Sequence, residues 1–187
     1  TTGSLKSCTI SVTADDQQGL TASGNYTQNV LGGSALTHLL YFAEGATGFF
    51  ETQFALLNAD ANNAATVVLE FQLTTGTVLT HALNIAKKSR ATINVSTLGG
   101  VNPALAPLAQ AEFSTVVRSD LPVIADRTMT WDSRGYGSHA EAAVQAPASK
   151  WYLAEGATIG NFELYYLIQN PNSASLNFTV TNLLRPP

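Results

Sequence analysis

The stretch LYFAEGAT at residues 40–47 decides the fold, because the chain repeats it almost unchanged as WYLAEGAT at residues 151–158. The two phrases lie 151 − 40 = 111 positions apart, and the likeness continues into the residues that follow each of them. Further on, Asn58 matches Asn170 at a spacing of 170 − 58 = 112, which indicates one inserted residue in the turn after AEGAT. We therefore expect the strands on either side of that turn to superimpose between the two copies.

Composition indicates a globular chain with an uncharged polar surface. The 187 residues are 45% hydrophobic but only 12% charged, about half the usual share of roughly 25%. This balance is typical of secreted β proteins. The net charge of −4 with nine Lys and Arg gives no basic field that would attract phosphates, so we do not expect a nucleic-acid partner.

The chain offers little for cysteine chemistry or for a membrane. Cys8 is the single cysteine, so no intrachain disulfide and no cysteine-based metal cage forms, and we expect no cofactor. No apolar run reaches the roughly 18 residues that span a bilayer, and the stretch TTGSLKSC at residues 1–8 lacks the organisation of a signal peptide. We expect a soluble chain, whose signal, if it is exported, has been removed or lies outside these residues.

Apolar and polar residues alternate over many short runs rich in β-branched and aromatic residues, which predicts strands with one buried face. Phe50, Phe54 and Leu56 alternate in one direction, and Val67 and Leu69 do so on the return, so residues 49–74 are interpreted as a hairpin. The predicted strands cover residues 8–13, 39–43, 49–58, 65–74, 78–85, 91–95, 112–118, 123–131, 151–154, 162–169 and 175–183.

Turn signals separate these runs at residues 58–63 (NADANN), 75–76 (TG), 119–122 (SDLP) and 170–172 (NPN). Residues 103–112 (PALAPLAQAE) allow a helix of at most a single turn, because Pro107 interrupts them.

Many short strands without helical crossovers favour an antiparallel sheet pair over a parallel α/β sheet. We therefore predict an all-β antiparallel β-sandwich, immunoglobulin-like or jelly-roll-like, organised as a tandem-repeat module. Residues 25–36 are compatible with more than one local structure.

The repeat divides the chain into three parts. Residues 39–150 form one complete sandwich repeat, and residues 151–187 supply the opening strands of a second. Strands left alone would expose unpaired edges, so we expect them to complete a sheet in this chain or in a neighbouring one. Residues 1–38 are an N-terminal strand or cap, or the diverged tail of a preceding module.

Over residues 39–183 the chain resembles a family of tandem-repeat domains from large bacterial surface or secreted proteins. The resemblance rests on the AEGAT phrases, on SRATINV at residues 89–95, and on the stretch from Val117 through Pro122 to Arg127, Met129 and Trp131. It implies an extracellular or cell-surface location and a structural or adhesive role. It supplies no catalytic residues.

We interpret AEGAT as a structural corner. Gly45 and Gly156 are expected to adopt the positive φ of a tight turn. Glu44 and Glu155 are expected to accept hydrogen bonds from backbone N–H groups where the strand leaves its sheet. A catalytic carboxylate is the less favoured alternative, because its copy in a partial second repeat would lack the same surroundings.

The richest polar cluster lies in the glycine-containing loop of residues 131–141. Together with Thr130, this loop reads TWDSRGYGSHAE. A flat aromatic ring beside carboxylate and guanidinium groups is a combination that sugar sites use. The alternative is that the tryptophan packs at a module junction while an aspartate and an arginine pair in the loop. The candidate ligand residues are Trp131, Asp132, Arg134, Tyr136, His139 and Glu141.

Known catalytic and metal motifs do not fit. His139 and Glu141 form half of a zinc deaminase signature whose two-cysteine half one Cys cannot supply. Asn58, Asp60 and Asn62 have calcium-loop spacing, but the following glycine and the closing glutamate are missing, so turn chemistry explains them better. We expect no enzyme activity and no metal site.

Two functions follow. The first is a non-catalytic structural module of an extracellular or cell-surface protein, which builds a stalk, fibre or surface layer by stacking on, or exchanging strands with, copies of itself or adjacent repeats. The second is an adhesion module that binds a carbohydrate or another surface partner through the loop of residues 131–141.

Overall fold

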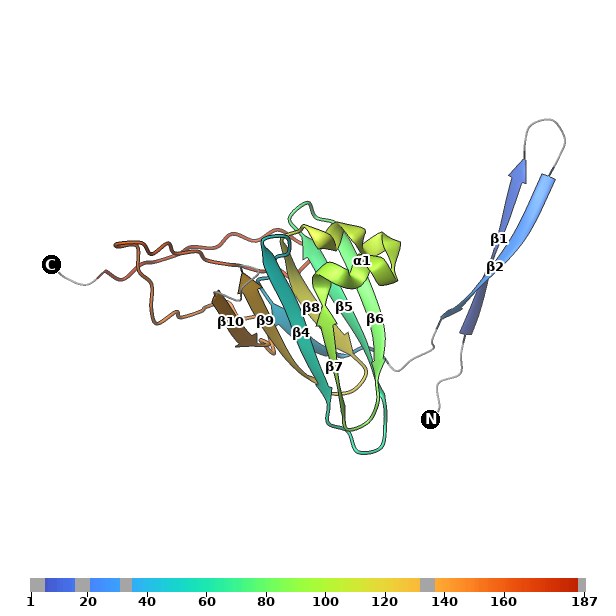
Figure 1. Ribbon diagram of the computed structural model, residues 1–187, viewed down its shortest axis with the longest axis horizontal. Helices are drawn as coiled ribbons and strands as arrows, with labels where there is room; N and C mark the ends of the chain where they lie inside the picture. Colours follow the sequence, from blue (N-terminus) through green and yellow to red (C-terminus); the bar gives the residue numbers. More distant parts are fainter. Residues whose placement is uncertain (1–5, 16–20, 31–34, 132–136, 185–187) are drawn as a thin grey trace.

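The structure, a computed structural model, describes residues 6–15, 21–30, 35–131 and 137–184 (Figure 1). Strands account for most of its regular structure, with short helices between β7 and β8. The elements are β1 Lys6–Asp15, β2 Thr21–Val30, β3 His38–Phe42, β4 Phe50–Asn58, β5 Ala65–Leu73, β6 Val78–Ile85, β7 Ser89–Asn94, η1 Val95–Thr97, α1 Leu98–Val101, η2 Pro103–Ala109, β8 Phe113–Ser119, β9 Ile124–Trp131 and β10 Gly137–Ala142.

Strands β3 to β10 form two four-stranded antiparallel sheets, with strand orders β3–β8–β5–β6 and β10–β9–β4–β7. The two sheets face each other as a sandwich (Figure 1). Strands β1 and β2 pair only with each other among the described residues. The prediction of an all-β, antiparallel, sandwich-like fold is confirmed at this level.

The core between the sheets comes from alternating side chains. Phe54 and Leu56 of β4, and Val67, Leu69 and Phe71 of β5, are fully buried, as the period of two predicts. The ring of Phe54 packs edge-on against Phe42 of β3, with centroids 5.1 Å apart, and lies 6.3 Å from the ring of Phe71. Burying each such side chain contributes roughly 2 kcal/mol.

The expected hairpin over residues 49–74 is wrong. β4 pairs with β7 and β9, whereas β5 pairs with β6 and β8 in the other sheet. Both strands bury one face, and that requirement is met when they face each other across the core. The turn at 119–122 likewise joins β8 to β9 in the opposite sheet.

Within the sandwich of β3 to β10, two connections are hairpins inside one sheet. β5 returns as β6 through the turn at Thr75–Gly76, where Gly76 has a φ of +84° that favours glycine. β9 returns as β10, a strand that sequence reasoning treated as part of a loop. After β10 the chain crosses to the other sheet, where the backbone N–H of Tyr41 donates to the carbonyl of Val144 at 2.9 Å.

The segment expected to form at most one helical turn is longer than predicted. η2 covers seven residues, about two turns at three residues per turn. Leu105 and Leu108 are three apart and therefore share one face, which is buried in the core together with Leu98 of α1. The helices lie across one end of the sandwich (Figure 1). No helix among the described residues is long and apolar enough to cross a membrane.

Residues 151–184 contain no strand, contrary to the three strands predicted there. They leave the sandwich as an unpaired trace (Figure 1). A strand exists by hydrogen bonding to a neighbour, and none lies beside these residues in the described chain. One contact to the sandwich comes from Gln169, whose Nε2 donates to the Oε1 of Gln72 at 3.2 Å.

We expect Asn58→Ala to lower the free energy of unfolding by about 3 kcal/mol, because it leaves buried backbone groups without partners. The fully buried Asn58 donates to the carbonyls of Asn63 at 2.9 Å and Ile85 at 3.0 Å, and accepts from the N–H of Asp60. Urea denaturation monitored by fluorescence measures the change. Asn62→Ala, in the exposed part of the same turn, should alter stability by no more than about 0.5 kcal/mol. Equal losses of stability in the two variants would contradict the structural role assigned to the buried Asn58 hydrogen bonds.

Candidate functional site

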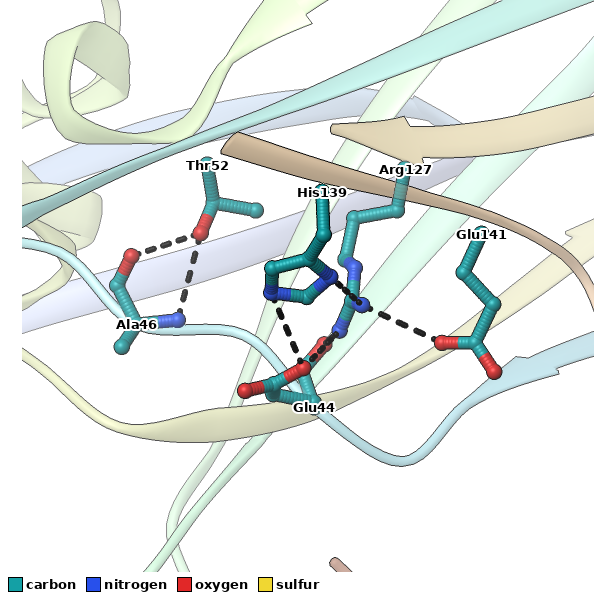
Figure 2. Close-up of polar contacts among 6 residues, drawn as sticks. All are labelled: Glu44, Ala46, Thr52, Arg127, His139 and Glu141. Carbon is teal, nitrogen blue, oxygen red and sulfur yellow. Dashed lines mark hydrogen bonds and ion pairs between the residues drawn. The ribbon is translucent and has the colours of Figure 1, made fainter. Parts of the chain in front are cut away.

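The AEGAT phrase carries the chain from β3 in one sheet to β4 in the other. Its Ala46 is fastened to the start of β4 by the buried Thr52, whose Oγ1 donates to the carbonyl of Ala46 at 2.6 Å (Figure 2). The same oxygen accepts from the N–H of Ala46 at 3.2 Å. One side chain thus replaces both ladder partners that the backbone loses where it changes sheets.

Thr47 fastens the corner to the chain between η2 and β8. Its backbone N–H donates to the carbonyl of Ala111 at 2.9 Å, and the N–H of Ala111 donates to its Oγ1 at 2.9 Å. The hydroxyl also donates to the carbonyl of Leu108 at 2.8 Å. These bonds connect residues more than sixty positions apart, so the corner holds the helical end of the sandwich in place.

Gly45 does not adopt the predicted positive φ, and neither does Gly156. The positive values fall later in each turn, at Gly48 with +93° and Gly160 with +66°. Gly45 is needed for space, because a Cβ there would lie 2.3 Å from the Phe113 ring. Gly156 is crowded in the same way, with Leu164 Cδ2 2.9 Å from such a Cβ.

The polar centre of the corner is Arg127 of β9, whose side chain is 1% exposed (Figure 2). Its Nη1 donates to the carbonyl of Glu44 at 2.6 Å and lies 3.0 Å from the Oε2 of the same residue. Its Nη2 donates to the Oε2 of Glu141 at 3.1 Å. A buried guanidinium needs such partners because burial removes its hydration.

His139 of β10 completes this cluster. Its Nδ1 lies 3.4 Å from Arg127 Nη2, and its Nε2 lies 3.5 Å from the Glu44 carboxylate. Arginine is always a donor, so Nδ1 accepts, which assigns the proton of the neutral ring to Nε2. The ring therefore bridges Arg127 and Glu44. We call Glu44, Arg127, His139 and Glu141 the arginine cluster.

The expected partners of Glu44 are therefore wrong. Its carboxylate binds the guanidinium of Arg127 and not the backbone N–H groups at the strand end. The physical reason is that β9 places a full charge beside the corner, and a charged donor outcompetes a backbone amide. Glu155, its counterpart in the second phrase, is exposed.

Each of the four side chains of the arginine cluster contacts another member, so the cluster serves as an internal clip. It joins the corner to β9 and β10, which come much later in the sequence. Among the buried side-chain atoms of the cluster, the Nε of Arg127 has no hydrogen-bond partner within the described residues.

Trp131 lies at the end of β9 and lines a cavity of 310 Å³ beside the corner. Its ring meets the ring of Phe50 edge-on, with centroids 6.1 Å apart, and Phe50 meets the exposed Phe49 in the same way at 5.1 Å. We call this the tryptophan pocket; its lining residues are Gly48, Phe49, Phe50, Glu51, Ser96, Ala109, Thr130 and Trp131.

One face of Trp131 is already used for packing. A Cβ on Gly137 of β10 would lie 2.1 Å from the indole ring, so the ring rests directly on the glycine backbone. The imidazole of His139 lies near the same indole, with centroids 5.9 Å apart. What remains of the indole for a ligand is therefore the part that lines the cavity.

Of the six residues predicted as one ligand site, the structure describes Trp131, His139 and Glu141, and the ring of His139 lies beside that of Trp131, with centroids 5.9 Å apart. Trp131 lines the pocket, whereas His139 and Glu141 belong to the arginine cluster. Asp132, Arg134 and Tyr136 lie outside the described residues.

Sequence reasoning missed the central role of Arg127. The signal was present, because Arg127 shares the inward parity of Ala125 and Met129, and a cation on an apolar face needs a buried partner. Glu51, Ser96 and Thr130 gave no such signal, since they come from three separate elements.

Other candidate sites are weaker. A second cavity, of 400 Å³, lies between the β5–β6 turn and η2 and is lined mainly by threonines and aliphatic side chains. The described residues hold no group of three or more His, Cys, Asp or Glu side chains that could bind a metal ion. In the turn after β4, the N–H groups of Asn62 and Asn63 lower the pKa of Asp60, which agrees with turn chemistry.

Comparisons with known proteins place few limits on function. No protein-family model matches the chain, and no curated protein matches it. A solved structure, the crystal structure of Thermotoga maritima 1070, is similar with a TM-score of 0.49 and 14% sequence identity. The similarity covers 60% of this chain and 97% of that one.

We expect Glu44→Ala to destabilise the protein by about 3 kcal/mol, because it leaves the buried Arg127 without its main counter-ion. Adding Arg127→Met should restore most of the loss, since no charge then stays buried. Thermal and urea unfolding of both single variants and the double variant measure this coupling. Glu70→Ala, which breaks the more exposed pair with Arg118 at 2.6 Å, should cost no more than about 1 kcal/mol. If the stability losses of the two single variants simply add in the double variant, Glu44 and Arg127 are not energetically coupled.

Gly45→Ala should lower stability by about 1–3 kcal/mol, because the added methyl group overlaps the Phe113 ring. Gly100→Ala is the matched control, since a Cβ there has no atom within 4 Å and alanine favours the helix. Differential scanning calorimetry should show a lower melting temperature for the first variant and an unchanged or higher one for the second. A fully stable Gly45→Ala protein would refute the spatial role of this glycine.

Proposed function

We propose that the protein is a non-catalytic structural module that builds a larger assembly through repeat stacking or strand pairing. Its partners are copies of itself or adjacent repeats. The observation that carries this proposal is the apolar surface of residues 151–184. Among the described residues, fifteen of the twenty large hydrophobic side chains that are exposed lie there. An apolar surface of that extent marks an interaction site.

The contacts of the AEGAT phrase support a structural role. Glu44, Ala46 and Thr47 each bind groups inside the sandwich, and Gly45 is packed beneath a ring. Recurrence of the phrase is then recurrence of a corner, because these residues are engaged in holding the fold. The same reasoning favours a protein without enzyme activity.

The proposed setting is extracellular, at a bacterial cell surface. It rests on the low share of charged residues, 12%, on the uncharged polar surface that the composition indicates, and on the family resemblance of the repeated motifs. Close packing of like modules in a stalk, fibre or layer suits a weakly charged surface, because like-charge repulsion between copies is small.

Within the sandwich class we propose an immunoglobulin-like arrangement. β5–β6 and β9–β10 are hairpins within one sheet, whereas the connections β3–β4, β4–β5, β6–β7, β7–β8 and β8–β9 cross between the sheets. Immunoglobulin-like sandwiches also combine inter-sheet crossings with hairpins inside one sheet.

A second candidate is an adhesion module that binds a carbohydrate, and the tryptophan pocket favours it. The pocket combines aromatic rings with the carboxylate of Glu51 and the hydroxyls of Ser96 and Thr130. Such groups stack on a sugar ring and hydrogen-bond its hydroxyls. The carboxylate already accepts a hydrogen bond from Asn94, which fixes it at the rim.

Self-association should depend on residues 151–184. We expect light scattering after size-exclusion chromatography to show larger species as concentration rises about a hundredfold, since association follows mass action. Phe162→Asp should suppress them, because it places a charge in the apolar surface. Ile124→Asp, at a similarly exposed position on the sandwich, should not. A strict monomer throughout would argue against assembly.

Glycan binding should depend on the tryptophan pocket if the second function is correct. Phe49→Ala removes a ring that is 70% exposed and carries no core contact, so it should abolish glycan-array signals while leaving the melting temperature unchanged. Leu57→Ala is the control, because Leu57 is exposed on β4 and does not line the pocket. Signals that survive Phe49→Ala would place the ligand elsewhere, and a blank array would remove this function.

A further inference from the structure

We infer that residues 151–184 are one half of a second sandwich, and that they bind four β-strands with the pattern of β6, β7, β8 and β9, including an arginine that pairs with Glu155. This inference rests on the proposed function and names its partner. The observation behind it is that residues 151–184 reproduce features of the first copy but lack the neighbouring strands that the first copy has.

The segment of residues 162–170 corresponds to β4 at a spacing of 112. Phe162 then matches Phe50, since 162 − 50 = 112, and Ile168 matches Leu56. Leu56 is fully buried, whereas Ile168 is 50% exposed. The same apolar alternation is therefore present, but nothing among the described residues covers it.

The segment of residues 176–182 corresponds to β5 at a spacing of 111, because the turn before it is one residue shorter. Phe178 then matches Val67, since 178 − 67 = 111, and Asn182 matches Phe71. Val67 is fully buried, whereas Phe178 is 61% exposed.

The two segments face each other in the register of β4 and β5. In the first copy Phe54 lies against Phe71, with ring centroids 6.3 Å apart. Their counterparts also meet, because the hydroxyl of Tyr166 donates to the Oδ1 of Asn182 at 2.6 Å. A polar contact has replaced an aromatic one at the same place in the repeat.

The turn between the segments also keeps its geometry. Asn58 Oδ1 accepts from the N–H of Asp60, and Asn170 Oδ1 accepts from the N–H of Asn172, each two residues on. Asn170 Nδ2 donates to the carbonyl of Ala174 at 2.9 Å, as Asn58 Nδ2 does across its own turn.

The glycine in the turn that follows AEGAT is also kept. Gly160 matches Gly48, since 160 − 48 = 112, and both have positive φ. The positive-φ glycine, the asparagine turn and the facing segments of the first copy are thus reproduced.

What is missing is the set of neighbours. In the first copy β4 is hydrogen-bonded by β7 and β9, and β5 by β6 and β8. Residues 162–170 and 176–182 have no strand beside them in the described chain. Four strands, two for each segment, would pair their backbones and cover their apolar faces.

The chemistry of the incoming strands follows from the first copy. Glu44 binds Arg127 of β9, so the exposed Glu155 calls for an arginine on the corresponding strand. Asn58 Nδ2 binds the carbonyl of Ile85 at the end of β6, so Asn170 calls for a carbonyl at that position. The strands β6 to β9 of this sandwich are already paired with β4 and β5, so the partner is a further set of strands of the same pattern.

The test extends the full chain with a second copy of its residues 77–150, which continue the register because 187 − 111 = 76. Amide hydrogen exchange in residues 162–169 and 176–182 should slow by at least about tenfold relative to the unextended chain, as expected for paired strands. β4 and β5 in the same sample are the internal reference. Binding of an apolar dye should fall at the same time.

Two controls make the result specific. A scrambled extension of the same composition should give no protection, and Arg127→Ala in the appended copy alone should weaken it, as should Glu155→Ala. Protection that is equal with the scrambled extension would overturn the inference. Protection in the unextended chain at high concentration that equals the protection in the extended chain would also overturn it, because two copies would then cover these segments as well as a second set of β6 to β9 does. No protection in any arm would overturn it as well, yet concentration-dependent assembly through residues 151–184 would leave the proposed function standing.

Discussion

One constraint organises the corner of the sandwich: the buried charge of Arg127 must be paired, and Glu44 pairs it. A guanidinium that is 1% exposed is tolerated only where carboxylates and carbonyls replace its water. This requirement ties β9 to a corner 83 positions earlier in the chain and, through Glu141, to β10. The positions of three elements follow from satisfying one charge.

Around that pair, the corner solves the problem of changing sheets. A chain that leaves one sheet loses its ladder partners before it gains new ones, and buried backbone groups cannot stay unpaired. Thr52 and Thr47 supply the missing donors and acceptors from their hydroxyls. The small size of Gly45 lets Phe113 close over the turn. Glu44, Gly45, Ala46 and Thr47 thus each have a separate physical role in the corner, which is a reason for these residues to occur together.

Sequence reasoning located the strands of the sandwich well but not their neighbours. Alternation with period two identified the buried faces of β4 and β5, yet it contains no information about which strand lies beside which. The supposed hairpin over residues 49–74 failed for that reason. The partner of Glu44 was equally invisible, because it depends on a contact between residues 83 positions apart. β10 was hidden by its mixed polar sequence, since its burial is slight.

The contrast between the two copies separates propensity from pairing. Residues 50–58 and 162–170 carry closely similar alternation, but only the first set forms a strand. The difference lies in the neighbours, because β7 and β9 supply the hydrogen bonds that define β4, and packing of the two sheets supplies the dry face. Side-chain pattern therefore determines which face a segment would bury, whereas the ladder determines whether it becomes a strand. In the proposed binding of complementary strands to residues 151–184, the exposed apolar side chains of that segment would supply the driving force.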